Sequence, residues 1–166
     1  MKKIIMMLML FAPLSLFAQK FGHIDAQAVL TQMPEAIKAN GEIQAQVKQY
    51  EDDLKAMQDE LQRKAQEYDK NKSTMNPTKQ QETEKSLNDM YQKIQETYQT
   101  NQQAIQKLQQ EKLAPITTKL VNAIKQVGKD GGYVYIMDVN SGIPYVSDTL
   151  SEDVTAKVKA ALTKMK

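Results

Sequence analysis

Two apolar heptad patterns run through the middle of the 166-residue chain, and they are mirror images of each other. In residues 35–71 and again in residues 77–108, apolar positions are separated alternately by four and three residues, as in a coiled-coil seam. Residues equally distant from Met75 and Asn76 have numbers that add to 151 or 152, as for Ile43 with Leu108 and Leu54 with Tyr98. This symmetry predicts an antiparallel helical hairpin over residues 35–112, as opposed to one uninterrupted parallel coiled coil.

The predicted seam is apolar with a few polar interruptions. Lys64 and Asn101 occupy seam positions, where polar residues generally lower stability but fix the register. We interpret the seam tyrosines mainly as hairpin core, and adaptable contact with unfolded chains is the alternative. The apolar seam residues are Ile43, Val47, Leu54, Met57, Leu61, Leu87, Ile94, Ile105 and Leu108, and the seam tyrosines are Tyr50, Tyr68, Tyr91 and Tyr98.

Turn chemistry lies at the centre of the symmetry, in residues 73–77. Pro77 suits the first position of a helix, and Asn76 suits the cap before it. Lys70, Lys72 and Lys79 surround this tip, and no acidic residue lies between positions 70 and 81. The lysines indicate either a positive tip for anionic lipid or acidic client segments, or a solvated helix end where cations are favourable.

The flanking residues, 19–34 and 113–166, predict a small β-containing body with a C-terminal helix. We expect strands at residues 21–25 and 133–139, and an edge strand at 143–147 because Pro144 cannot donate a hydrogen bond. Thr155 is the expected cap of the last helix. Pro115 is expected to bend the second hairpin helix or to remove one of its hydrogen bonds. The predicted fold class is therefore α+β, mostly α.

The body is expected to be an association site. It has roughly fifty residues, which is close to the lower limit for an independent core. Its strand at 133–139 is apolar on both faces and should be covered on both sides. These two features predict an oligomer that associates through Ile24, Val134, Ile136 and Val146.

The N terminus has the organisation of a signal peptide. Lys2 and Lys3 precede an apolar run over residues 4–17, and cleavage is expected after about Ala18. An uncleaved anchor is the alternative. The sequence has 22 basic and 20 acidic residues, and removal of the two N-terminal lysines leaves 20 of each. A net-neutral mature chain argues against nucleic acid as a partner, and the lack of cysteine excludes disulfides.

The sequence gives no indication of catalysis. His23 is the only histidine, and a single histidine in a strand is more often structural than a metal ligand or a general base. No carboxylate pair, Gly-rich phosphate loop or nucleophile motif stands out. We therefore expect no enzyme activity, no cofactor and no metal.

Several pieces of the sequence occur in a characteristic order around two charged, Gln-rich helical arms: residues 23–30, Pro34, 113–116, 132–138, Tyr145 and 153–158. Together they resemble the Skp/OmpH family of periplasmic chaperones over the whole mature length. The resemblance implies a homotrimer whose bodies share a β-structure and whose arms enclose unfolded outer-membrane proteins without ATP. Family members are often markedly basic, so the balanced charge here leaves at most weak contact with anionic lipid headgroups. A structural coiled-coil spacer of the cell envelope is the alternative function.

Overall fold

The computed structural model describes residues 19–165, which form two compact units. One unit contains residues 27–121, and the other contains residues 19–26 with 122–165. The expected signal peptide, residues 1–18, lies outside the described residues. The elements in chain order are β1 (Lys20–Ile24), α2 (Ala26–Leu30), α3 (Pro34–Asn71), the 3-10 turn η2 (Lys72–Thr74), α4 (Pro77–Gly131), β2 (Tyr133–Asp138), β3 (Ser151–Asp153) and α5 (Thr155–Lys164).

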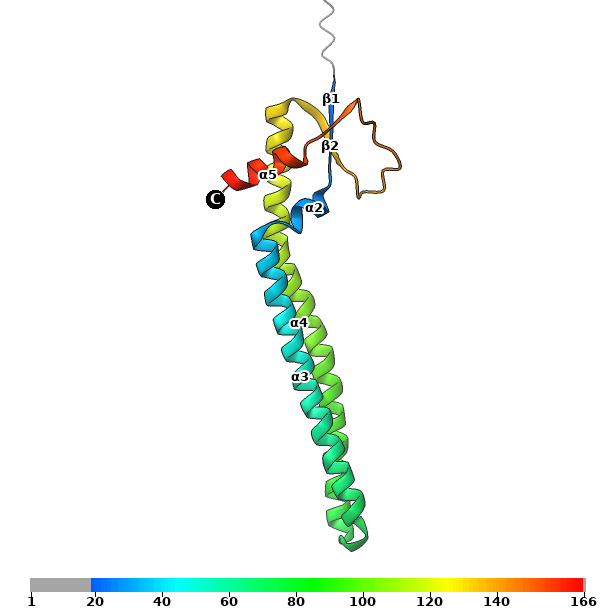
Figure 1. Cartoon of the computed structure of the whole chain (residues 1–166). Coiled ribbons are helices and arrows are strands. Elements are labelled where there is room, and N and C mark those ends of the chain that lie inside the picture. Colours follow the sequence, from blue (N-terminus) through cyan, green and yellow to red (C-terminus); the bar gives the residue numbers. More distant parts are fainter. Residues whose placement is uncertain (1–18, 166) are drawn as a thin grey trace, which may run out of the picture. The chain divides into compact units, whose positions relative to one another are not determined.

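The first unit is dominated by an antiparallel hairpin of α3 and α4, which lie side by side (Figure 1). Three side-chain pairs join the two helices at different heights. The carboxylates of Glu35 and Glu42 pair with Lys119 and Lys112 at 2.7 and 2.5 Å. Near the turn, the Tyr68 hydroxyl donates to a Glu84 carboxylate oxygen at 2.5 Å. Residue numbers thus fall on one helix as they rise on the other, and the predicted hairpin is confirmed.

The turn between the helices uses the residues that the sequence indicates. α4 begins at Pro77, and the Asn76 side-chain oxygen accepts a hydrogen bond from the Lys79 backbone N–H at 2.9 Å. This bond satisfies a donor that lacks a partner inside the helix. The Gln80 side-chain amide donates to the carbonyl oxygens of Lys72 and Met75. The predicted cap and helix start are confirmed.

α4 continues through Pro115 without interruption and ends at Gly131. Gly132 follows with a φ of 66°. This left-handed conformation strains residues that carry a Cβ, so glycine suits the position after a helix end. The chain then enters β2 directly at Tyr133.

The second unit contains a three-stranded sheet in the order β2-β1-β3, with both pairings parallel. The central strand β1 approaches its surroundings closely at Gly22. A Cβ atom there would lie 3.1–3.3 Å from side-chain atoms of Ile136, Tyr133 and Val154. Glycine therefore allows close packing on this face, where Ile24, Val154 and Val158 are fully buried.

Two expectations for this unit are wrong. Residues 143–147 form no strand, and the third strand is Ser151–Asp153. Gly142, with a φ of 77°, and Pro144, which lacks an N–H, favour a loop at the expected position. Thr155 is the first residue of α5, and its backbone N–H donates to the Asp153 carboxylate at 2.8 Å. Val154 occupies the cap position without a side-chain bond, and the Asp153 carboxylate accepts from the first N–H of the helix.

Candidate functional site

The seam residues of the hairpin are less completely buried than the heptad pattern suggests. Ile43 and Ile94 are each only 6% exposed. The other predicted apolar seam residues, Val47, Leu54, Met57, Leu61, Leu87, Ile105 and Leu108, are half-buried. Lys64 and Asn101 are half-buried as well, so the polar interruptions lie where they were predicted. The seam holds the two helices together, and the hairpin surface that remains is available to partners.

Tyr91 and Tyr98 do not belong to this seam. They are 55% and 51% exposed, and the expectation that they form hairpin core is wrong. The half-buried positions are their neighbours Met90 and Thr97, and Ala104 is half-buried one heptad later. The residue numbers of Met90 and Leu61, of Thr97 and Leu54, and of Ala104 and Val47 each add to 151. Ile43 and Leu108 give the same value. This constant value is the sequence signal that could have excluded Tyr91 and Tyr98 from the seam, because their pairs add to 152.

Size and polarity explain why the rings lie outside the seam. Neighbouring residues on a helix are separated by about 100° of rotation, so only one of each pair can face the other helix. Met, Thr and Ala fill a narrow seam with flexible or small side chains. A tyrosine at its edge can pack one side of the ring and keep its hydroxyl in water. Tyr68 differs, because it is buried and donates to Glu84, a bond that raises the pKa of its hydroxyl.

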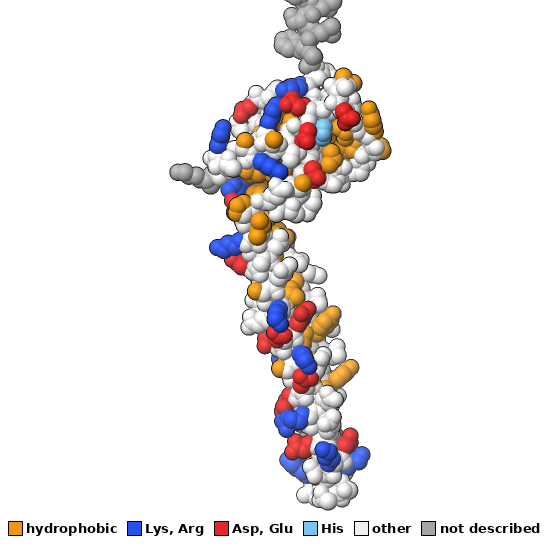
Figure 2. Space-filling model, in the orientation of Figure 1, with side chains coloured by type: hydrophobic (Ala, Val, Ile, Leu, Met, Phe, Trp, Pro, Cys, Tyr) orange, Lys and Arg blue, Asp and Glu red, His pale blue; other side chains and the backbone are white. Residues whose placement is uncertain are grey.

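Charged residues cover much of the remaining hairpin surface. On α3, Lys48 pairs with Asp52 at 3.0 Å and Lys55 pairs with Asp59 at 2.9 Å. Such exposed pairs one helical turn apart contribute little stability and keep the surface solvated. Figure 2 shows charged side chains of both signs over the helices. This surface offers few fixed contact points for a rigid partner.

The three lysines predicted at the tip are all exposed. Lys72 lies 4.0 Å from Asp69, and Lys79 lies 3.4 Å from Glu82. Acidic residues just outside the segment 70–81 therefore partly offset the positive charge. The tip is less electropositive than its lysines alone suggest.

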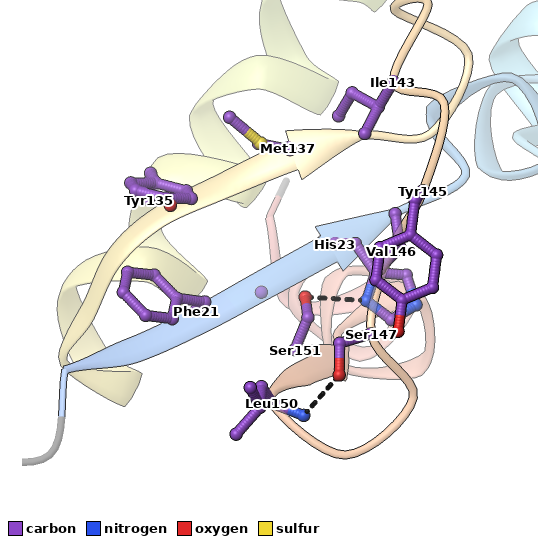
Figure 3. A pocket seen from close by; sticks show the side chains of 11 residues that line it. Phe21, His23, Tyr135, Met137, Ile143, Tyr145, Val146, Ser147, Leu150 and Ser151 are labelled. Carbon is purple, nitrogen blue, oxygen red and sulfur yellow. Dashed lines mark hydrogen bonds between the residues drawn. The ribbon is translucent and has the colours of Figure 1, made fainter.

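In the other unit, one face of the sheet is open and apolar. The ring centroids of Phe21 on β1 and Tyr135 on β2 are 4.9 Å apart. Figure 3 shows the two side chains on neighbouring strands. Tyr135, Met137 and Tyr145 are exposed and line a shallow pocket together with Phe21. An exposed group of large apolar side chains typically marks an interaction surface. Sequence reasoning missed this group, although alternation along β2 places Met137 on the same face as Tyr135.

The four predicted association residues are placed in different environments. Ile24 is buried inside the unit, and Ile136 is half-buried on the covered face near Gly22. Val134 is exposed on β2, and Val146 is half-buried at the pocket of the open face. The structure thus gives Ile24 and Ile136 packing partners within the chain.

His23 also lies at the open face, where its Nδ1 atom is 2.9 Å from the Ser151 hydroxyl (Figure 3). In residues 19–165 no group of three or more His, Asp or Glu side chains could hold a metal ion. None of the helices in this range has the length and hydropathy of a membrane span.

A polar cluster at one end of the sheet contains one side chain from each of four elements and connects them. Glu152 on β3 accepts hydrogen bonds from Lys157 on α5 and from the Tyr133 hydroxyl on β2, the latter at 2.6 Å. Lys20 on β1 adds an ion pair at 3.1 Å. These donors, Lys157 first, lower the pKa of Glu152 to about 2, and contacts within the cluster raise the pKa of both lysines. Sequence reasoning missed this cluster because its members are distant in the chain.

The fold and its surfaces define a class: an antiparallel coiled-coil hairpin in one chain with a small parallel sheet that has an open apolar face. The chain belongs to the family described as "Outer membrane protein (OmpH-like)", whose sequence model matches residues 20–162. It is 29% identical over 151 residues to the chaperone protein Skp of Yersinia enterocolitica, covering 91% of this chain and 90% of the relative.

One further relative and one solved structure are similar to this chain. The chaperone protein Skp of Pectobacterium atrosepticum is 24% identical over 141 residues, which cover 85% of this chain and 84% of the relative. A crystal structure described as that of a "putative outer membrane chaperone (OmpH-like)" from Caulobacter crescentus CB15 superposes with a TM-score of 0.76 at 16% identity. The superposition covers 89% of this chain and 86% of that chain, and it shows the same fold.

Proposed function

We propose that this protein is a holdase chaperone of the periplasm, which binds unfolded outer-membrane proteins and prevents their aggregation without a nucleotide. The observation that carries the proposal is the family match over residues 20–162, together with relatives described as chaperones along nearly their whole length. The N-terminal signal-peptide pattern supports export, with cleavage after about Ala18.

The hairpin surface supports this function physically. A holdase has to accept many sequences, so numerous weak and adaptable contacts suit it better than one deep pocket. Several arms acting together raise the effective concentration around a client without strong single contacts. Long, solvated helices 38 and 55 residues in length fit that requirement.

Assembly into a homotrimer through the sheet-containing unit is part of the proposal. The open apolar face around Tyr135, Met137 and Tyr145 supports it, because covering these side chains removes apolar area from water. We place the association body in residues 19–34 and 113–166 and the client-holding arm in residues 35–112. Contact of Lys70, Lys72 and Lys79 with anionic lipid is at most weak, since two of these lysines have acidic neighbours.

The test is suppression of aggregation. An outer-membrane β-barrel protein unfolded in urea is diluted into buffer with and without the mature chain, and light scattering is followed in the absence of nucleotide. We expect scattering to fall as the chain is added. Unchanged scattering at a several-fold molar excess would favour a structural spacer of the cell envelope.

A further inference from the structure

Tyr91 and Tyr98 form an aromatic pair on one exposed face of α4. A separation of seven residues brings two side chains back to nearly the same face of a helix. Both rings are more than half exposed. Figure 2 shows hydrophobic side chains standing out from one edge of the hairpin.

Between residues 88 and 105 the helix face around these rings carries no charged side chain, and Glu84, one turn before Asn88 on this face, ends the uncharged stretch. Positions that share the face at three- and four-residue spacing carry only amide, aromatic and aliphatic side chains. They extend over about 26 Å of helix. We call this face the tyrosine lane. It consists of the exposed residues Asn88, Tyr91, Gln95, Tyr98 and Gln102, and it ends at Ile105, which is half-buried at the edge of the seam.

The other side of the seam on the same helix has the opposite character. Its exposed positions include Asp89, Lys93, Glu96 and Lys107, and Lys107 forms an ion pair with Glu111 at 3.7 Å. Three of these charged residues, Asp89, Lys93 and Glu96, lie within the length of the tyrosine lane, and the lane itself has none. Solubility does not explain this difference, because both sides need it equally.

We propose that the tyrosine lane is the surface on which α4 holds clients, and that its occupant is an uncharged, extended segment rich in aromatic and aliphatic residues. The proposal rests on the holdase function and specifies its site. Membrane-facing strands of an unfolded outer-membrane β-barrel have this chemistry, since their apolar residues alternate along the chain.

Each side chain of the lane suits such an occupant. The tyrosine rings offer rigid apolar area at low entropic cost. The amides of Gln95 and Gln102 can both donate and accept, so they match the unpaired N–H and C=O groups of an extended backbone. No charged group of the lane has to lose its water when the segment binds. The lane is long enough for roughly eight extended residues.

A second copy of this chain fits the lane less well than a client segment. A tyrosine buries about 150–250 Å² when fully covered. Two rings that are already half covered leave roughly 200 Å², against about 800 Å² per partner in a stable interface. The lane therefore suits a transient occupant that binds and leaves.

The test replaces both tyrosines by serine, Tyr91→Ser/Tyr98→Ser. The matched control is Lys93→Ser/Thr100→Ser, which has the same spacing on the charged side of the seam. A third variant, Tyr91→Phe/Tyr98→Phe, keeps the rings. Affinity for a labelled outer-membrane β-barrel protein diluted from urea is measured by fluorescence anisotropy, with helicity and sedimentation measured for every variant.

We expect the serine variant to bind roughly five- to tenfold more weakly, as for the loss of two modest aromatic contacts. The control and the phenylalanine variant should stay within about twofold of the wild type. Unchanged binding by the serine variant, or equal weakening by the control, overturns the lane and leaves the holdase function intact. A changed oligomeric state of the serine variant overturns it in favour of contact between copies. Failure of the wild type to bind the client refutes the holdase function itself.

Discussion

At the scale of single residues, Glu152 is the side chain that most clearly links distant parts of the sequence. Its carboxylate accepts hydrogen bonds from Lys157 and Tyr133 and pairs with Lys20, and these residues belong to three other elements. Each contact favours the ionised form, which is why the pKa of Glu152 falls from 4.5 to about 2. A carboxyl group with a lowered pKa in the folded state stabilises the fold above its unfolded pKa and loses that effect as the pH falls through its folded pKa.

We therefore predict that Glu152→Gln lowers the stability of the folded chain at pH 7. The difference from the wild type should persist down to about pH 4.5 and disappear as the pH approaches about 2. The cluster is partly exposed, so the effect is expected to be modest. Urea denaturation at pH 7, 5 and 3 measures it, and a difference that grows towards low pH would contradict the assigned cause.

At the scale of elements, the hairpin depends on which side chain of each neighbouring pair faces the seam. Ile94 is almost completely buried, whereas Tyr98, one turn further along α4, is half exposed. Removal of buried methyl groups costs stability through lost burial and the cavity left behind. Truncation of an exposed side chain changes stability much less.

Accordingly, Ile94→Ala should lower the free energy of unfolding by about 2–4 kcal/mol. Tyr98→Ala should change it by less than about 1 kcal/mol. Thermal or urea melts followed by far-ultraviolet circular dichroism compare the two variants directly. Equal losses would mean that Tyr98 packs in the seam, as the heptad pattern alone suggests.

The contrast between Ile94 and Tyr98 also shows how much of the structure can be predicted from the sequence. The hairpin follows from local signals, because the heptads, Asn76 and Pro77 all agree on one turn. The choice between Thr97 and Tyr98 as the seam residue depends on how two helices pack, and a single heptad pattern allows either. The third strand was missed for a similar reason: Ser151–Asp153 has no apolar alternation, and it is a strand only because it pairs with β1.

At the scale of the whole molecule, the open sheet face determines what assembly has to cover. Ile136 packs near Gly22 within the chain, so a charge there would disturb the unit itself. Tyr135 and Met137 are exposed in the single chain. If the homotrimer forms through this face, Tyr135→Asp/Met137→Asp should dissociate it and leave helicity and cooperative unfolding intact. Analytical ultracentrifugation at micromolar concentration is the measurement, and an intact trimer would move the interface elsewhere.

The length of the hairpin should determine which clients are protected. Residues 44–50 and 101–107 face each other on the two helices. The numbers of facing residues in these segments add to 151, as they do for the seam residues. Deletion of both segments removes one heptad from each helix and shortens the hairpin by about 10 Å. Tyr91 and Tyr98 stay in place, and the remaining seam keeps its register.

We predict that this double deletion assembles normally and still protects small clients, but protects large ones less. The reason is that shorter arms enclose less volume. Tyr91 and Tyr98 are kept, and the loss of Gln102 and Ile105 shortens the tyrosine lane equally for small and large clients. Light scattering with a small and a large outer-membrane β-barrel protein, each diluted from urea, provides the comparison. Deletion of residues 44–50 alone is the control. It should lower the melting temperature because α3 residues before position 44 then face other residues of α4, which separates Glu35 and Glu42 from Lys119 and Lys112. Equal protection of both clients by the double deletion would show that enclosure by the arms does not limit client size.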